Sequence, residues 1–63
     1  MRKFVFFKSP KDGKTKVAVN VSKIIGVYFD EKENRTVINC ESNNNYAVFD
    51  SIDDVIDKLF PYM

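Results

Sequence analysis

The sequence predicts an α+β protein in which five antiparallel strands form one sheet and a single C-terminal helix packs on it. Two observations carry this prediction. Five short segments rich in β-branched and aromatic residues alternate with turn-forming residues, and apolar residues at helical spacing occupy the end of the chain. The order β-β-β-β-β-α is typical of a meander, either open or curled into a partial barrel. With 63 residues, the chain (1–63) forms one small domain.

The first two predicted strands form a hairpin. Residues 4–7 are aromatic and β-branched, and the loop that follows contains Pro10 and Gly13. Residues 15–20 alternate in character, with Val17 and Val19 on one face. A kink over residues 20–23 then separates this hairpin from the rest of the sheet.

Three further strands are predicted over residues 24–29, 36–40 and 46–49. The charged segment 30–34 forms a solvated turn between the first two of them. Three consecutive asparagines at 43–45 suit a turn with positive φ angles, because asparagine tolerates the left-handed conformation.

The C-terminal helix is the clearest element of the sequence. Its apolar stripe consists of Ile52, Val55, Ile56, Leu59 and Phe60. Ser51 or Asp50 caps its start, and Pro61 ends it. Four aspartates are expected to form a solvated acidic face opposite the stripe: Asp50, Asp53, Asp54 and Asp57.

The residue inventory argues against an enzyme. The chain has one cysteine and no histidine, so neither a Cys–His nor a Ser–His pair exists. Cys40 lies inside a predicted strand, where a buried, unreactive thiol is expected. Zinc-type sites need several Cys or His ligands, and no glycine-rich phosphate loop occurs. We therefore predict no catalytic residues, no metal and no cofactor.

Cysteine usage and hydropathy predict a cytoplasmic protein. A lone cysteine cannot form an intramolecular disulfide, whereas small secreted domains usually carry several. The apolar run at residues 4–7 is shorter than a signal peptide requires, and no stretch has the length of a membrane span. We expect no membrane partner.

Charge is unevenly distributed although the net charge is only +1. Residues 1–23 carry +6 and residues 36–63 carry −4. The basic, aromatic N-terminal hairpin is a candidate nucleic-acid surface, since lysines neutralise phosphates and exposed aromatic rings stack on bases. The candidate contacts are Lys8, Lys11, Lys14 and Lys16. In the alternative interpretation the phenylalanines are core and the lysines only keep an edge strand soluble.

The pattern of the strands favours a protein-binding or regulatory module that acts through a sheet face and the C-terminal helix. Several strands carry large apolar residues on both faces, yet one helix covers only one face of a sheet. Either curling buries the second set, or a homodimer or another protein partner covers it. The candidate interface residues are Phe4, Phe6, Tyr28 and Tyr46.

Residues 16–60 also resemble two families. The resemblance rests on Val17-Ala18-Val19-Asn20, Ile24-Ile25-Gly26-Val27, Arg35-Thr36-Val37-Ile38-Asn39 and Tyr46-Ala47-Val48-Phe49 followed by an amphipathic helix. This order is similar to the FlbD-like group of small bacterial flagellar-operon proteins and to the first half of the LytTR DNA-binding domain. The chain also looks like small phage and prophage proteins, a likeness that implies binding to a host protein.

Overall fold

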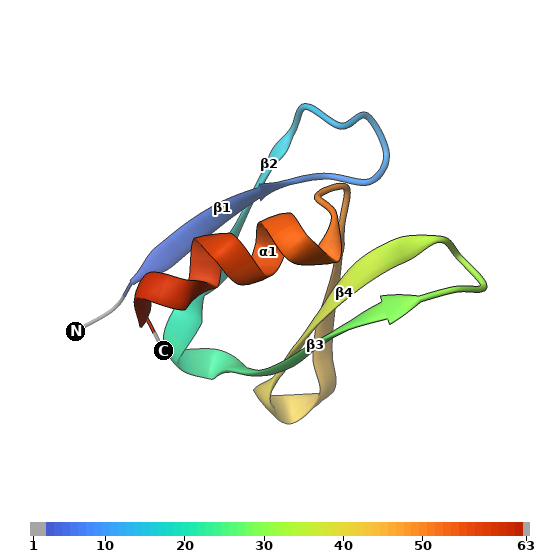
Figure 1. Ribbon diagram of the computed structural model, residues 1–63. Helices are drawn as coiled ribbons and strands as arrows, with labels where there is room; N and C mark the ends of the chain where they lie inside the picture. Colours follow the sequence, from blue (N-terminus) through green and yellow to red (C-terminus); the bar gives the residue numbers. More distant parts are fainter. Residues whose placement is uncertain (1–2, 63) are drawn as a thin grey trace.

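The computed structural model describes residues 3–62, and these form an α+β fold with one C-terminal α-helix (Figure 1). The strands are β1 (Phe4–Lys8), β2 (Lys16–Asn20), β3 (Ile24–Asp30), β4 (Arg35–Cys40) and β5 (Asn44–Val48). The helix is α1 (Ile52–Leu59), and the short 3₁₀ turns are η1 (Val21–Lys23), η2 (Glu41–Asn43) and η3 (Phe60–Tyr62). The predicted elements are confirmed in type and order.

The prediction of a single five-stranded sheet is wrong. The strands form two antiparallel sheets, one made of β1 and β2 and the other of β3, β4 and β5 in that order. The break falls at η1, where the Asn20 side chain accepts a hydrogen bond from the Ser22 amide at 3.1 Å. This cap turns the chain before β3 begins, so β2 and β3 do not pair as a hairpin.

Two backbone hydrogen bonds lie at the ends of β1, of which the first connects the hairpin to the end of β5 and the second extends the hairpin itself. The Phe49 amide, just after β5, donates to the Lys8 carbonyl oxygen at 2.7 Å. At the opposite end of β1, the Val21 amide donates to the Lys3 carbonyl oxygen at 2.9 Å. Helix α1 lies between the hairpin and β3 and contacts both β1 and β3 (Figure 1).

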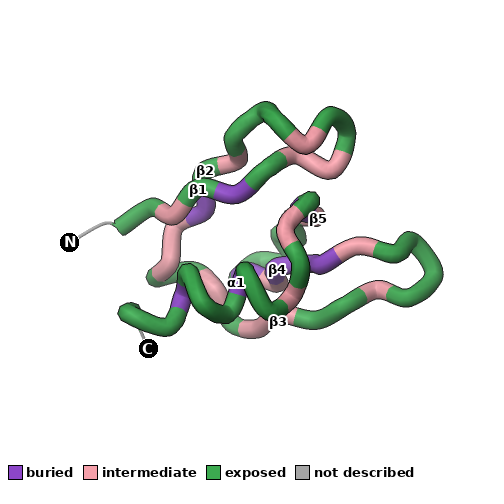
Figure 2. Tube along the Cα trace, turned by 45° about the horizontal axis from the view of Figure 1, so that its top comes forward, coloured by how far each residue is buried: buried purple, intermediate pink, exposed green. Residues whose placement is uncertain are grey.

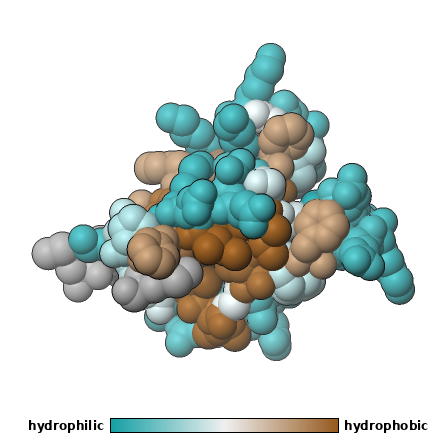
Figure 3. Space-filling model, viewed as in Figure 1, coloured by the Kyte–Doolittle hydropathy of each residue, from teal (hydrophilic) through white to brown (hydrophobic). Residues whose placement is uncertain are grey.

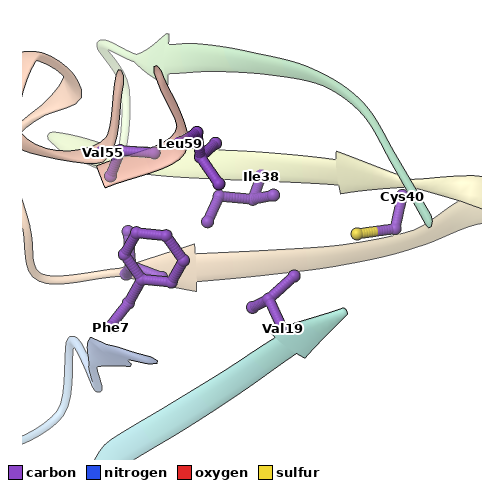
Figure 4. Packing of buried hydrophobic residues seen from close by; sticks show 7 residues of the cluster. Phe7, Val19, Ile38, Cys40, Val55 and Leu59 are labelled. Atoms are coloured by element: carbon purple, nitrogen blue, oxygen red, sulfur yellow. The ribbon is translucent and has the colours of Figure 1, made fainter. Parts of the chain in front are cut away.

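The core lies between the two sheets and the helix. Buried positions occur on β1, β2, β4, β5 and α1 (Figure 2). Phe7 and Val19 from the hairpin face Ile38 from β4 and the helix residues Val55 and Leu59 (Figure 4). The buried cluster comprises Phe7, Val19, Ile38, Cys40, Val48, Val55 and Leu59.

Strand register decides which residues face this core. Residues paired across antiparallel strands point to the same face. Val5 pairs with Val19 on the inner face of the hairpin, whereas Phe6 pairs with Ala18 on the outer face. In the other sheet Ile38 pairs with Val27 and Tyr46 on the inner face.

Helix α1 begins where the sequence predicts. Ser51 is the N-cap, and its hydroxyl oxygen accepts a hydrogen bond from the Asp54 amide at 3.1 Å. The α-helix ends at Leu59, and Pro61 lies within the 3₁₀ turn η3. Of the predicted apolar stripe only Val55 and Leu59 are buried, whereas Ile56 and Phe60 are exposed. Part of the apolar stripe of α1 therefore lies outside the core.

The predicted solvated face of four aspartates is wrong for Asp50. Only 7% of its side chain is exposed, and it lies 3.1 Å from Lys58 Nζ. Asp50 Oδ1 also accepts a hydrogen bond from the Lys8 amide at 2.8 Å, and Lys58 Nζ donates to the Phe6 carbonyl oxygen at 3.0 Å. This pair joins β1, the segment before α1 and α1 itself, so Asp50 is a structural residue.

The asparagine cluster is only partly the predicted turn. Positive φ occurs at Ser42 (62°) and Asn43 (61°) in η2, whereas Asn44 and Asn45 already belong to β5. Within residues 3–62, no helix is long and apolar enough to cross a membrane.

Candidate functional site

An apolar groove runs between β3 and the C-terminal end of α1. Its volume is about 340 Å³. The lining residues are Val21, Ile24, Ile25, Gly26, Val27, Ile56, Leu59 and Tyr62. In the orientation of Figure 1, hydrophobic surface extends over this side of the molecule (Figure 3). The groove brings together side chains from a strand, a helix and the two 3₁₀ turns that flank them.

The orientation of α1 explains why Ile56 borders this groove. Lys58 reaches the Phe6 carbonyl oxygen, so its side of the helix faces β1. At 100° per residue, Ile56 lies on the other side of Val55 and Leu59 and therefore faces β3. Phe60 follows Ile56 by four residues on the same flank and is exposed.

The strand wall of the groove is irregular. The register between β3 and β4 shifts between Ile24 and Gly26, which leaves Ile25 as the extra residue of a β-bulge. The Ile25 side chain is 66% exposed, although it is large and aliphatic and lies at the edge of the groove. A side chain at Gly26 would meet no atom within 4 Å, so the space beside this residue is open.

The outer face of the β1–β2 hairpin is aromatic and basic. Phe4 and Phe6 point away from the core and are half exposed, as the alternation of β1 requires. Lys8 and Lys16 pair directly across the strands on this same face. Lys16 Nζ lies 5.9 Å from the centroid of the Phe6 ring, within cation–π range.

The other two predicted lysines, Lys11 and Lys14, lie in the hairpin loop. Asp12 orders this loop by accepting hydrogen bonds from the amides of Lys14 at 2.8 Å and Thr15 at 2.9 Å. The Thr15 hydroxyl also donates to Asp12, and these bonds lower the pKa of Asp12 to about 2. The loop therefore carries a negative charge between its lysines at neutral pH.

The four candidate interface residues do not form one surface. Phe4 and Phe6 share the outer face of the hairpin. Tyr28 pairs with Val37 on the outer face of the three-stranded sheet, and Tyr46 pairs with Ile38 on its inner face. Tyr28 and Tyr46 therefore project from opposite faces of the same sheet, and each is partly exposed.

A second cavity, of about 190 Å³, lies between β2 and the β4–β5 connection. Its lining residues are Val19, Asn20, Lys23, Cys40, Glu41, Ser42, Asn44 and Tyr46. Cys40 is buried, as predicted, and burial together with the nearby Glu41 raises the pKa of its thiol. A protonated, enclosed thiol is a poor nucleophile. Among residues 3–62 no group of three or more His, Cys, Asp or Glu side chains is placed to hold a metal ion.

The groove residues Ile25, Ile56 and Tyr62 were absent from the candidate interface predicted from sequence. A signal for Ile56 was present, because the helical stripe has five apolar residues and a narrow helix–sheet contact buries fewer. For Ile25 the available signal was Gly26, because a glycine inside a strand pattern often marks a β-bulge, and the register shifts beside this residue.

Comparison of the chain with family models, with curated proteins and with solved structures gives no match. The resemblance to FlbD-like proteins and to the LytTR domain therefore stays a prediction from the sequence.

Proposed function

We propose that this protein is a small non-enzymatic binding module and that the groove between β3 and α1 is its protein-docking surface. The observation that carries the proposal is the convergence of exposed apolar side chains from β3, α1 and η3 on one groove. Concave apolar surfaces of this kind are where short protein segments dock on small domains.

The geometry favours an extended segment as the ligand. β3 is an edge strand, so its outer backbone groups are available to a strand added beside it. Alternate side chains of such a strand would point into the groove, between Ile25 and Ile56. Backbone hydrogen bonds would then supply affinity, and the groove would select apolar side chains.

Selection from a displayed library of unstructured peptides tests this proposal. We expect enriched peptides with apolar residues at alternate positions, and we expect Ile56→Asp to abolish their binding. The matched control is Phe6→Asp, which introduces the same charge on the outer face of the hairpin. Phe6 is 54% exposed. Failure to enrich any peptide, or equal binding to the wild type and Ile56→Asp, would contradict the proposal.

A second candidate function, nucleic-acid binding, is favoured by the outer face of the hairpin. Two half-exposed phenylalanines and two lysines share that face. Single-stranded oligonucleotides bind such surfaces by base stacking and phosphate contacts, and their affinity falls steeply with salt. Fluorescence anisotropy of a labelled oligonucleotide across a salt series measures this. Binding that persists at physiological salt and is lost in Phe6→Asp would make this function the better one.

A further inference from the structure

The outer edge of β3 can form backbone hydrogen bonds with another strand. β3 is seven residues long, and within residues 3–62 no strand is hydrogen-bonded to this edge. Edge strands are usually protected by lysines, prolines or bulges. Ile24–Asp30 contains no lysine and no proline, and its bulge at Ile25 lies at one end. Most of the edge is therefore open to another strand.

We propose that a second copy of this chain pairs antiparallel with β3 about a two-fold axis through Val27. This inference rests on the proposed function, because it names the partner whose strand occupies the groove. The two three-stranded sheets would become one six-stranded sheet with both helices on the same face. A closed two-fold dimer is the commonest assembly of small soluble proteins.

Side-chain complementarity selects Val27 as the centre. In this register Gly26 of one copy lies opposite Tyr28 of the other, on the outer face. The open space beside Gly26 accommodates an aromatic ring, an arrangement that stabilises glycine in sheets. The bulge residue Ile25 of one copy lies next to Phe29 of the other, and both side chains are exposed in the single chain.

The same register fills both grooves. Phe29 pairs with the buried Thr36 of β4, so its ring lies on the helix side of the sheet, where it is 44% exposed. Antiparallel pairing through Val27 places this ring beside Ile25 of the second copy, at the wall of that copy's groove. The exchange is reciprocal, and two exposed phenylalanines become covered.

Charge at the ends of the strand is also complementary. Lys23 precedes β3 and Glu31 follows it, and pairing through Val27 places Lys23 of one copy near Glu31 of the other. Among residues 3–62 Lys23 bridges Glu41 at 3.4 Å, and both side chains are largely exposed. A typical stable interface covers about 800 Å² per partner. That is about a sixth of the 4763 Å² surface of the described chain.

Sedimentation equilibrium over a dilution series tests the dimer. We expect the wild type to have twice the 7.3 kDa mass of the chain at micromolar concentration. Phe29→Asp should raise the dissociation constant at least about thirtyfold, because it places a charge where an aromatic anchor is buried. The control Phe6→Asp should leave the dimer intact. Circular dichroism verifies that both variants fold.

A cysteine cross-link tests the register. Val27→Cys places one thiol of each copy directly across the two-fold axis, so mild oxidation should link the two chains. Tyr28→Cys, displaced from the axis, should link far more slowly. A monomeric wild type, a dimer unaffected by Phe29→Asp, or equal cross-linking of both cysteine variants would overturn the inference.

The tests of the dimer can fail without contradicting the proposed function, and the reverse also holds. Phe29 does not line the groove of its own chain, so Phe29→Asp should bind the selected peptides at least as tightly as the wild type, in which the second copy competes for the groove. Loss of the dimer with retained peptide binding supports both proposals. A monomeric wild type that binds peptides through Ile56 overturns the dimer alone.

Discussion

Replacing Asp50 by alanine should destabilise the protein more than any substitution of the exposed helix aspartates. Its two carboxylate oxygens accept hydrogen bonds from the Lys8 amide at 2.8 Å and from Lys58 Nζ at 3.1 Å. Lys58 Nζ also lies 5.1 Å from the centroid of the Phe7 ring, at the centre of the core. Asp50→Ala therefore removes two hydrogen bonds that join the segment before α1 to β1 and to α1.

The expected loss is about 2–3 kcal/mol. A hydrogen bond to a charged group contributes about 1.5–3 kcal/mol when it is buried, but Lys58 is partly exposed and water replaces some of that bond. Asp50→Asn keeps one acceptor oxygen and should lose about 1 kcal/mol. A 63-residue domain has a total stability of about 3–9 kcal/mol, so the alanine variant should show a much lower urea midpoint.

The effect should depend on pH. Burial raises the pKa of Asp50, but the hydrogen bonds from Lys8 and Lys58 and the Lys58 charge outweigh it, so the folded pKa is lowered. The ionised carboxylate therefore stabilises the folded state above its unfolded pKa of about 3.9, and this contribution is lost as pH falls through the folded pKa.

Urea denaturation at fixed protein concentration, followed by circular dichroism, measures both effects. Asp57→Ala is the matched control, because it makes the same substitution at an exposed aspartate of α1. A loss no larger in Asp50→Ala than in the control would refute the reasoning. So would a difference between wild type and Asp50→Ala that stays constant from neutral pH to about pH 2.

Two further predictions concern the core and the helix cap. Cys40 should react with iodoacetamide far more slowly in the folded protein than in urea, because it is buried and its pKa is raised, and mass spectrometry follows the labelling. Rapid native labelling would contradict this burial. Ser51→Ala should cost about 1 kcal/mol in urea denaturation by removing the hydroxyl that caps α1, whereas Ser51→Asp should keep most of that stability.

Local chemistry determined most of the secondary structure. The alternation of β2, the Ser51 cap and the apolar spacing of α1 each depend on neighbours a few residues away, so all three could be predicted from the sequence. The prediction that strands carry large apolar residues on both faces holds for β1, where Phe4 and Phe6 lie opposite Val5 and Phe7. The burial of Cys40 followed from its place inside a strand.

Only the tertiary structure decided how these elements meet. The way the two sheets meet depends on the bond from the Phe49 amide to the Lys8 carbonyl oxygen, which joins residues far apart in the chain. Asp50 looked like its neighbouring aspartates until the fold brought Lys8 and Lys58 to it. The groove likewise exists because α1 turns Ile56 toward β3 and the bulge exposes Ile25. Strand pairing and helix placement depend on contacts between residues far apart in the chain, and local residue patterns do not determine those contacts.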